Sequence, residues 1–326
     1  MPSDSTQPFG VLLMAYGSPG SLDEVEGYYT HVRGGRAPSP EQLEAVRERY
    51  ARIGGSTPLL AISQGQAEAL AERLEADAPG RYRVYLGMRH WHPHLADTVR
   101  QMVADGISEA VGIVLAPHDS RISVGGYIEM VEQAISTLPS EPGQPALIRF
   151  RYVRTWHDEP HYLAGLAERV QAASEREFAP AEQQTLHVIF TAHSLPERVL
   201  QWQDPYPEEL RRTATHVAGL LGLPAERWSF AYQSAGRTPE PWLGPEIRET
   251  ITRLAKEGRR HLLICPVGFI ADNLEILYDI DIECQDVAKE LGVHLARIEM
   301  LNTSPHVIAA LEAITLAATR DMQPAT

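Results

Sequence analysis

Short apolar runs alternate with amphipathic stretches along this chain, and this alternation limits the fold more than any other sequence feature. Strands that alternate with helices favour β-α-β units, in which parallel strands form a sheet covered by helices. The sequence therefore predicts an α/β protein. In the first half, strands are expected at 9–19, 83–91 and 110–118, and helices at 40–50, 62–75, 94–105 and 126–138.

The second half of the chain repeats this plan. Residues 185–196 (TLHVIFTAHSLP) match residues 9–19 (FGVLLMAYGSP), and the proline-rich stretch 140–146 separates the halves. Further strands are predicted at 146–153, 227–236 and 261–275, the last running into a helix.

This repetition predicts two similar Rossmann-like domains, each a four-stranded parallel sheet flanked by helices. We expect an N-terminal domain at residues 1–145 and a C-terminal domain at 146–326, with the last helix packing back on the first domain.

Polar side chains follow several of the predicted strands at the point where each strand ends. In open α/β sheets, ligands bind at the carboxyl ends of the strands. Two such domains facing each other would line one cleft from both sides, and we expect the functional site there. The strand-end residues are Tyr16, His90, His118, His193, Gln233 and the group at 272–275.

His193 and Ser194 look like a catalytic dyad, but their spacing argues against one. Neighbouring side chains on an extended segment point to opposite faces, so these two residues cannot easily share a proton. His193 therefore needs another role in the cleft.

Three carboxylates recur every fourth residue after the last predicted strand. Glu275, Asp279 and Glu283 would lie on one face of a helix. Like charges so placed repel each other unless cations or protons compensate them. A solvated acidic surface is the simpler interpretation, but Glu275 would lie near His193. Histidine with carboxylates and no thiolate suits Fe²⁺ or a similar divalent ion.

Other motifs are less specific. The histidines of HWHPH (90–94) would be solvated at a turn rather than form a zinc site, although His90 remains a candidate for the pocket. Residues 28–41 read as a polar loop in which Arg33 and Arg36 could grip carboxylates. The sequence has no phosphate-binding loop, so a bound nucleotide is not expected.

Composition excludes several classes of protein. The formal net charge is −14, which disfavours nucleic acid and anionic membrane surfaces as partners. The two cysteines, Cys265 and Cys284, are too few for a disulfide framework or a four-cysteine iron–sulfur cluster. The N-terminus has no signal-peptide pattern, and no apolar run reaches the roughly 20 residues that span a bilayer. We expect a cytoplasmic protein without membrane insertion.

The motifs together resemble those of the ferrochelatases, most closely the coproporphyrin III ferrochelatases of Gram-positive bacteria. The likeness covers nearly the whole chain. It includes VLLMAYGSP, YYTHVRGGR, IVLAPH, FTAHSLPERV, YQSAGRTPEPWLGP, CPVGFIADNLEILYDIDIEC and MLN. It implies a lyase of haem biosynthesis, with two four-stranded domains around a porphyrin cleft. Fe²⁺ would be a substrate, the enzyme a monomer, and a haem-pathway enzyme a transient partner.

The resemblance also implies roles for individual residues. His193 and Glu275 would form the catalytic pair that handles the metal and the pyrrole protons, and Tyr16 would lie on the opposite face as an axial ligand of the product's iron. Asp279 and Glu283 would form an outer acidic track for a second hydrated cation such as Mg²⁺. The expected porphyrin contacts are Tyr16, Arg33, Arg49, Tyr50, Thr57, His90 and Tyr127.

The chain departs from the family pattern at three positions. Asn273 stands where many ferrochelatases have a histidine, Gly34 where close relatives often have a second arginine, and Thr57 where serine is common. The polar mouth around Arg33 favours coproporphyrin III, which has four propionates. The alternatives are a protoporphyrin IX ferrochelatase, a cobalt chelatase of the same fold, or a non-enzymatic haem-binding or haem-transfer protein.

Overall fold

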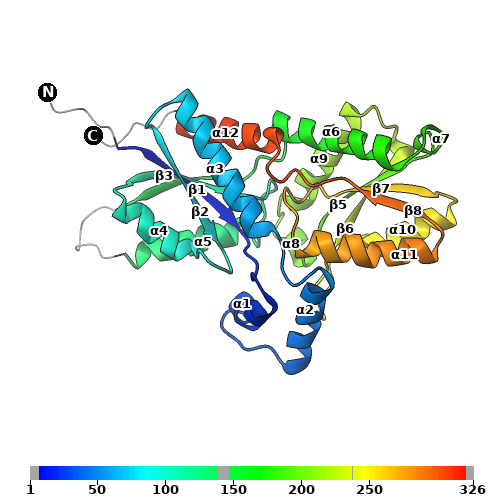
Figure 1. Ribbon diagram of the computed structural model, residues 1–326, viewed down its shortest axis with the longest axis horizontal. Helices are drawn as coiled ribbons and strands as arrows, with labels where there is room; N and C mark the ends of the chain where they lie inside the picture. Colours follow the sequence, from blue (N-terminus) through cyan, green and yellow to red (C-terminus); the bar gives the residue numbers. More distant parts are fainter. Residues whose placement is uncertain (1–6, 139–146, 237, 321–326) are drawn as a thin grey trace.

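Two four-stranded parallel sheets, each flanked by helices, form the protein (Figure 1). The computed structural model describes residues 7–138, 147–236 and 238–320. The first sheet contains β1 (Phe9–Ala15), β2 (Tyr82–Met88), β3 (Glu109–Val114) and β4 (Arg149–Val153). The second contains β5 (His187–His193), β6 (Trp228–Gln233), β7 (His261–Cys265) and β8 (His294–Arg297).

The two sheets have the same topology, which confirms the predicted repetition. Their strand orders are β2-β1-β3-β4 and β6-β5-β7-β8, and all neighbouring strands are parallel. The central strands β1 and β5 are the two whose sequences match. Their carboxyl ends therefore occupy equivalent places in the two halves.

Each central strand is buried on both faces, and successive residues face different cores. On β1, Val11 and Leu13 belong to one apolar cluster, whereas Leu12 and Met14 belong to another. This is the period of two that an extended chain imposes. Because helices cover both faces of the sheet, the strand sequence is a nearly continuous apolar run.

Helices from both halves of the chain surround the sheets. Those of the first half are α1 (Val25–Val32), α2 (Pro40–Arg52), α3 (Leu59–Asp77), α4 (Leu95–Ala104) and α5 (Val124–Ser136). Those of the second half are α6 (Pro160–Glu177), α7 (Pro180–Gln183), α8 (Arg198–Gln201), α9 (Tyr206–Leu220), α10 (Ile247–Lys256), α11 (Gln285–Glu290) and α12 (Pro305–Thr319). Two short 3₁₀ turns, η1 (Leu22–Glu24) and η2 (Ala225–Arg227), and a π-helix, η3 (Ile276–Cys284), complete the elements.

Strand β4 corrects the predicted domain boundary. It follows residue 145, but it pairs with β3 and completes the first sheet. A division at 145 would separate a strand from its own sheet, so we place the division after Val153. The predicted linker, residues 140–146, lies outside the described residues.

The two halves share one hydrophobic core. The cluster that contains Val11 on β1 and Leu70 on α3 also contains Val188 on β5 and Leu311 on α12. Helix α12 packs against α3 and α6, and Arg73 of α3 forms an ion pair with Glu312, 2.6 Å apart. The last helix thus contacts the first half, as the sequence predicted.

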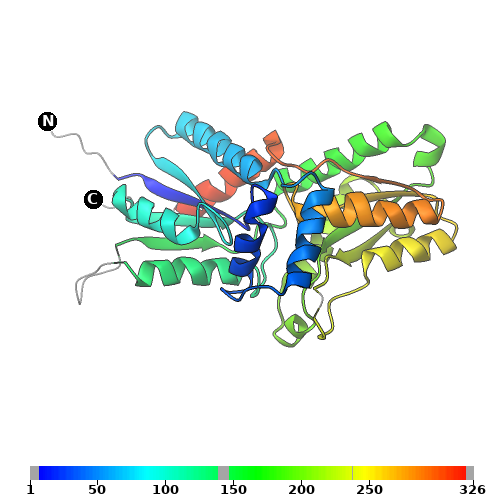
Figure 2. The same cartoon turned by 60° about the horizontal axis from the view of Figure 1, so that its bottom comes forward.

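The segment predicted as a polar loop at 28–41 begins as a helix. Helix α1 extends from Val25 to Val32, and Arg33 ends it. Val25 and Tyr28 are buried against Tyr50 of α2, and this tertiary packing stabilises a helix whose local sequence is polar. Figure 2 shows α1 and α2 side by side, and in Figure 1 both lie below the place where the two halves meet.

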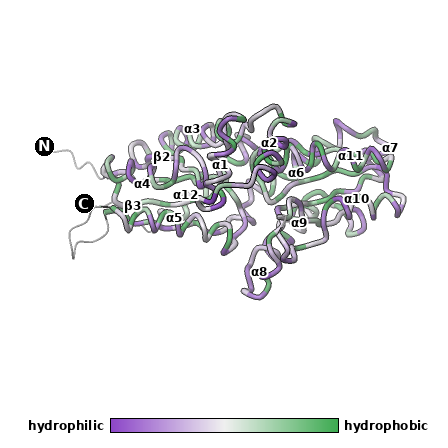
Figure 3. Tube along the Cα trace, turned by 90° about the horizontal axis from the view of Figure 1, so that it is seen from below, coloured by the Kyte–Doolittle hydropathy of each residue, from purple (hydrophilic) through white to green (hydrophobic). Residues whose placement is uncertain are grey.

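Exposed apolar side chains lie on two short elements at the surface. The short helix α8 projects from the second half, as Figure 3 shows. Leu200 and Trp202 at this projection and Leu22 at η1 are exposed. No helix within the described residues is long and apolar enough to span a bilayer.

Candidate active site

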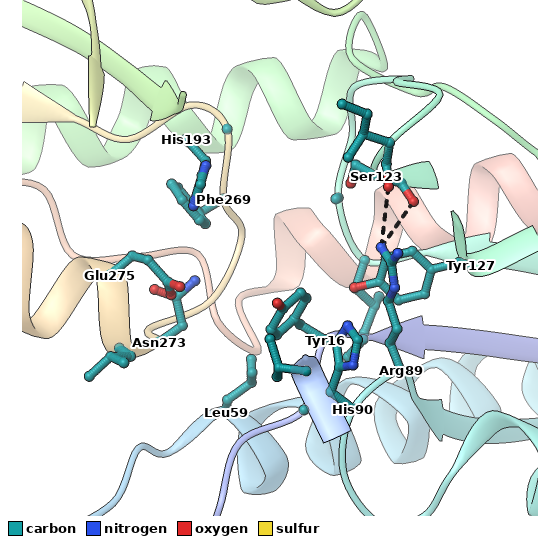
Figure 4. Close-up of a pocket in the computed structure, with 18 of the residues that line it drawn as sticks. Tyr16, Leu59, Arg89, His90, Ser123, Tyr127, His193, Phe269, Asn273 and Glu275 are labelled. Carbon is teal, nitrogen blue, oxygen red and sulfur yellow. Dashed lines mark hydrogen bonds between the residues drawn. The ribbon is translucent and has the colours of Figure 1, made fainter. Parts of the chain in front are cut away.

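A cavity of about 550 Å³ lies at the carboxyl ends of both sheets, with one wall from each half. Its volume falls in the ordinary range for small-molecule sites. In Figure 4, His193, Phe269, Asn273 and Glu275 face Tyr16, Arg89, His90, Ser123 and Tyr127 across an open space.

His193 is the last residue of β5, and hydrogen bonds fix its position. Its Nδ1 contacts the carbonyl oxygen of Ser194, which can only accept, so Nδ1 carries the proton. In the neutral imidazole the lone pair is then on Nε2. The Tyr206 hydroxyl donates to the His193 carbonyl at 3.0 Å and holds the end of the strand. This tautomer gives the imidazole a free nitrogen that can bind a metal or accept a proton.

A glycine lets the next loop cross the end of β5. A Cβ on Gly268 would lie 2.5 Å from the Cβ of Ala192, so another side chain would force the two segments apart. The Gly268 amide donates to the carbonyl of Thr191 at 3.1 Å. This close approach brings Phe269 and the segment that carries Glu275 next to His193.

Asn302 holds the same loop through hydrogen bonds to Ile270 and Asp272. Its backbone amide donates to Ile270 at 2.7 Å, and its side chain exchanges hydrogen bonds with Asp272 at 2.8 and 2.9 Å. Gln66 of α3 donates to the Asn302 carbonyl at 2.6 Å, which ties this arrangement to the first half. Asn302 has a φ of 47°, in the left-handed region that asparagine tolerates better than most residues.

Glu275 precedes the π-helix η3, which replaces the α-helix predicted here. The Asn273 side chain accepts a hydrogen bond from the Ile276 amide at 2.9 Å and caps the first turn. In a π-helix each amide bonds to the carbonyl five residues earlier, a rare geometry that recurs at functional sites.

The predicted acidic stripe is divided between two environments. Glu275 lines the cavity, whereas Asp279 lies outside its lining. Asp279 is bonded to Arg49 and Ser234, one to each carboxylate oxygen. Glu283 lies 3.6 Å from Arg248. The expected repulsion along the stripe is therefore relieved by arginines. No group of three or more His, Cys, Asp or Glu side chains in the described ranges could hold a metal ion.

Tyr16 faces the cavity directly after β1. Gly17 has a φ of +94°, and a Cβ there would lie 2.8 Å from the backbone nitrogen of Trp91. The Tyr16 side chain lines the cavity and 40% of the residue surface is accessible, so the ring is open to a ligand. The surrounding protein raises the pKa of Tyr16 to about 12, and the Glu275 carboxylate adds to this effect. The phenol is therefore protonated at neutral pH.

His90 lies against Tyr16, with the two ring centroids 4.6 Å apart. Burial, with a further contribution from the Arg89 charge, lowers the pKa of His90 to about 3, so this imidazole is neutral. His31 of α1 contacts His90, their Nδ1 atoms 3.2 Å apart, and stacks on His94. The strand ends at Met88, so the histidines of HWHPH form an aromatic cluster rather than one face of a strand.

The cavity unites most of the predicted site residues. Of the expected porphyrin contacts, Tyr16, Tyr50, His90 and Tyr127 line it with His193 and Glu275. Arg33, Arg49 and Thr57 do not. Arg33 ends α1 and donates to the Arg36 carbonyl, while the Thr57 hydroxyl accepts from the Leu59 amide at the start of α3.

Sequence reasoning missed four residues that build the site. Gly268, Tyr206 and Asn302 position the His193 wall, and Arg89 lines the opposite wall. Arg89 directly precedes His90 at a strand end, a place that already marked polar residues as candidates.

Comparisons with known proteins agree with this architecture. The sequence model of the ferrochelatase family matches residues 8–319. The chain belongs to the ferrochelatase family. It is 45% identical to a ferrochelatase of Herpetosiphon aurantiacus, over 93% of this chain and 97% of that protein. It is 44% identical to the coproporphyrin III ferrochelatase of Geobacillus kaustophilus, over 94% of this chain and 95% of that one.

Solved structures of chelatases share the fold. SirB from Bacillus subtilis with Fe³⁺ aligns with a TM-score of 0.58 at 15% identity, over 97% of this chain and 98% of that one. The sirohydrochlorin chelatase SirB of the subspecies spizizenii, in complex with cobalt, aligns with a TM-score of 0.54 at 12% identity, over 96% and 97% of the two chains. At such low identity these likenesses concern the fold alone. As a ferrochelatase, the chain is a lyase that acts as a metal chelatase.

Proposed function

We propose that this ferrochelatase inserts Fe²⁺ into coproporphyrin III to form coproheme. The observation that carries the proposal is the cavity at the meeting point of the two sheets. It has a histidine and a carboxylate on one wall and an accessible phenol on the other. This arrangement suits a flat macrocycle that must exchange two protons for a metal ion.

In this proposal His193 and Glu275 carry the chemistry. The reaction binds one Fe²⁺ and releases the two pyrrole N–H protons. The free Nε2 of His193 and the Glu275 carboxylate can each bind the incoming iron or accept a proton. They lie on the same wall, so both act on one face of the porphyrin.

Tyr16 and its neighbours hold the opposite face. Tyr16 stays protonated in the free enzyme because its pKa is about 12, so it does not compete with His193 and Glu275 for protons. In the product complex the Tyr16 oxygen could bind the iron as an axial ligand, with the phenol proton released to solvent.

Contacts at the rim of the macrocycle supply the energy to bend it. A planar free-base porphyrin does not present its nitrogens to an ion above the ring, whereas a bent ring does. Binding energy from groups remote from the reacting centre can offset such strain, which is typically about 1–5 kcal/mol.

The expected second cation at Asp279 and Glu283 does not fit the donor set. Arg49 and Ser234 already engage both carboxylate oxygens of Asp279, and Glu283 lies beside Arg248. No step of the proposed mechanism uses this cation.

The choice of coproporphyrin III rests on the mouth and on the relatives. The α1–α2 segment carries Arg33 and Arg36, and neither forms an ion pair with a carboxylate within the described residues. Free guanidinium groups at the mouth suit a substrate with four propionates. Several relatives with 41–44% identity are named coproporphyrin III ferrochelatases. One chain provides both walls of the cavity, so we propose that the monomer is active.

The decisive assay compares two porphyrins under anaerobic conditions. The enzyme is mixed with Fe²⁺ and either coproporphyrin III or protoporphyrin IX, and metallation is followed by absorbance. We expect kcat/KM at least about tenfold higher with coproporphyrin III, which corresponds to about 1.4 kcal/mol. Equal or higher kcat/KM with protoporphyrin IX would refute the choice of substrate.

Two controls test the alternatives and the mouth. Preference for Co²⁺ and a reduced tetrapyrrole would identify a cobalt chelatase, and haem binding without metallation of either porphyrin would identify a transfer protein.

Replacing both Arg33 and Arg36 by glutamine should reduce the preference for coproporphyrin III. Arg100→Gln, which removes an exposed arginine paired with Asp97 on α4, should not change it.

A further inference from the structure

Arg89 has a guanidinium group in the cavity wall without an acidic partner. It lines the cavity beside Tyr16, Ser123 and Tyr127, as Figure 4 shows. No Asp or Glu of the described residues lies within ion-pair distance of it. Its Nε is buried without a hydrogen-bond partner, and none of the described residues accepts from Nη2.

The contacts that Arg89 does make are weak. Its Nη1 donates to the carbonyl oxygens of Ile122 and Ser123, both at 3.4 Å, beyond the usual N–H···O range. The guanidinium also lies over the Tyr127 ring, 5.0 Å from its centroid. A half-buried charged group with so few partners is costly, and a bound anion would reduce that cost.

The local backbone also favours an anion near Arg89. Its guanidinium packs on Gly126, in the first turn of α5, where a Cβ would lie only 2.3 Å from Nη2. The amino end of a helix carries a partial positive charge, so a cation there is unfavourable unless a negative group joins it. The Ser123 side chain makes no capping hydrogen bond to α5, and none of the described residues pairs with the Tyr127 hydroxyl.

We propose that Arg89, with Ser123 and Tyr127, binds one propionate carboxylate of the porphyrin inside the cavity. This inner carboxylate subsite is distinct from Arg33 and Arg36 at the mouth, which do not line the cavity. It rests on the proposed function, because the ligand is the porphyrin of that reaction. A macrocycle anchored at both ends would be fixed between His193 and Tyr16, and its rim contacts could bend it.

The test measures porphyrin binding without iron, by quenching of porphyrin fluorescence. Coproporphyrin III and its tetramethyl ester are compared in the same mixed solvent. Arg89→Gln should weaken binding of the acid by about tenfold or more, the usual worth of a charge-assisted contact. It should leave binding of the ester unchanged. Arg89→Lys, which keeps the charge but loses the planar fork, should fall between wild type and Arg89→Gln.

Two further variants separate this role from a merely structural one. Gly126→Ala should displace the guanidinium without removing its charge, and should also weaken binding of the acid more than of the ester. Arg100→Gln, a matched loss of one surface charge, should change neither. Thermal unfolding checks that each variant is folded.

Unchanged affinity of Arg89→Gln for coproporphyrin III, or an equal loss for acid and ester, would overturn the inner carboxylate subsite. These outcomes are independent of the proposed reaction. Failure of the wild-type protein to metallate porphyrin would refute the proposed function, whereas a wild-type enzyme that metallates normally while Arg89→Gln binds normally would refute only the subsite.

Discussion

Tyr16 and His193 occupy matching positions in the two halves of the molecule. The sequences Ala15-Tyr16-Gly17 and Ala192-His193-Ser194 each end the central strand of a sheet with the same topology. The two side chains face each other across one cavity (Figure 4). The same place in a repeated fold thus carries a protonated phenol in one half and an imidazole with a free lone pair in the other.

The neighbouring strands extend this comparison. Ala15 pairs with Met88 and Ala192 with Tyr232, so Arg89 and Gln233 are the next residues in matching positions. Gln233 is fully buried and accepts a hydrogen bond from Thr191 at 2.8 Å, whereas Arg89 points its charge at the cavity. In the second half the side chain at this position hydrogen-bonds to the neighbouring strand. In the first half it lines the cavity, where a ligand would bind. We infer that the second half performs the chemistry and the first half holds the porphyrin.

His193→Ala tests this division of roles and should have the largest effect on turnover. Loss of the imidazole removes the free Nε2, and turnover should fall at least about 10³-fold, since positioned proton acceptors contribute about 10²–10⁴-fold. Porphyrin affinity should change little, because Tyr16 and Arg89 remain. The rate of iron insertion and the fluorescence titration measure the two effects separately. Near-normal turnover would remove His193 from the mechanism.

Glu275→Gln should have the next largest effect, a loss of about 10²-fold in turnover. The change keeps the size of the side chain but removes its charge and basicity. It should also lower the pKa of Tyr16, because the Glu275 carboxylate helps to raise it. Ultraviolet titration of the tyrosines checks this shift. Asp279→Asn is the matched control, and a larger loss of turnover in that variant would assign the proton to Asp279 instead.

Gly268→Ala tests how the second half positions its wall. The added methyl group would lie 2.5 Å from the Cβ of Ala192, so the loop must shift. We expect a loss of about 1–3 kcal/mol in the free energy of unfolding, as in other overpacked cores, and a lower kcat. Gly219→Ala, whose Cβ meets no atom within 4 Å, is the control. Equal behaviour of the two variants would show that the close approach at Gly268 is unimportant.

His90 in the first half should make the free energy of unfolding fall at acidic pH. Its pKa is lowered to about 3 by burial, so the unfolded chain binds a proton near pH 6.5 that the folded protein does not. Stability is therefore full above about pH 6.5 and declines as the pH falls toward 3. His90→Gln should reduce this slope, measured by urea unfolding at several pH values, and exposed His161→Gln should not. An unchanged slope in His90→Gln would contradict this assignment.

Tyr16→Phe should have the smallest effect on turnover, a loss of less than about tenfold. The phenyl ring keeps the contact surface, and the lost hydroxyl is protonated in the free enzyme. The absorption spectrum of the bound product should change more than kcat, because a tyrosine ligand to its iron would be absent. A product spectrum identical to that of wild type would exclude Tyr16 as that ligand.

Local sequence predicted β1 to β7, because buried parallel strands are continuous apolar runs, but it did not predict β8 (His294–Arg297). The predicted strands at 9–19 and 185–196 correspond to β1 and β5, and the polar residues at their ends line the cavity. The repetition was visible for the same reason. Helix α1 was missed because burial of Val25 and Tyr28 against Tyr50 stabilises it, and the polar segment itself gives no such signal.

Contacts between distant segments were beyond sequence reasoning. Arg49, an expected porphyrin contact, pairs with Asp279, 230 positions away in the chain, and nothing in the sequence indicated this pair. The hydrogen bonds of Asn302 to the loop before Glu275 and to α3 depend in the same way on tertiary structure. Arg89 was overlooked because an arginine near the end of a strand is ordinary until its surroundings show that it lacks an acidic partner.

Single-turnover metallation under anaerobic conditions tests the division of roles most directly. Wild type, His193→Ala and Tyr16→Phe are each mixed with coproporphyrin III and Fe²⁺, while fluorescence reports binding and absorbance reports metallation. We predict that His193→Ala binds the porphyrin and does not metallate it, and that Tyr16→Phe metallates it within about tenfold of the wild-type rate. Metallation that persists in His193→Ala and is abolished in Tyr16→Phe would contradict the account, because it would assign the chemistry to the first half.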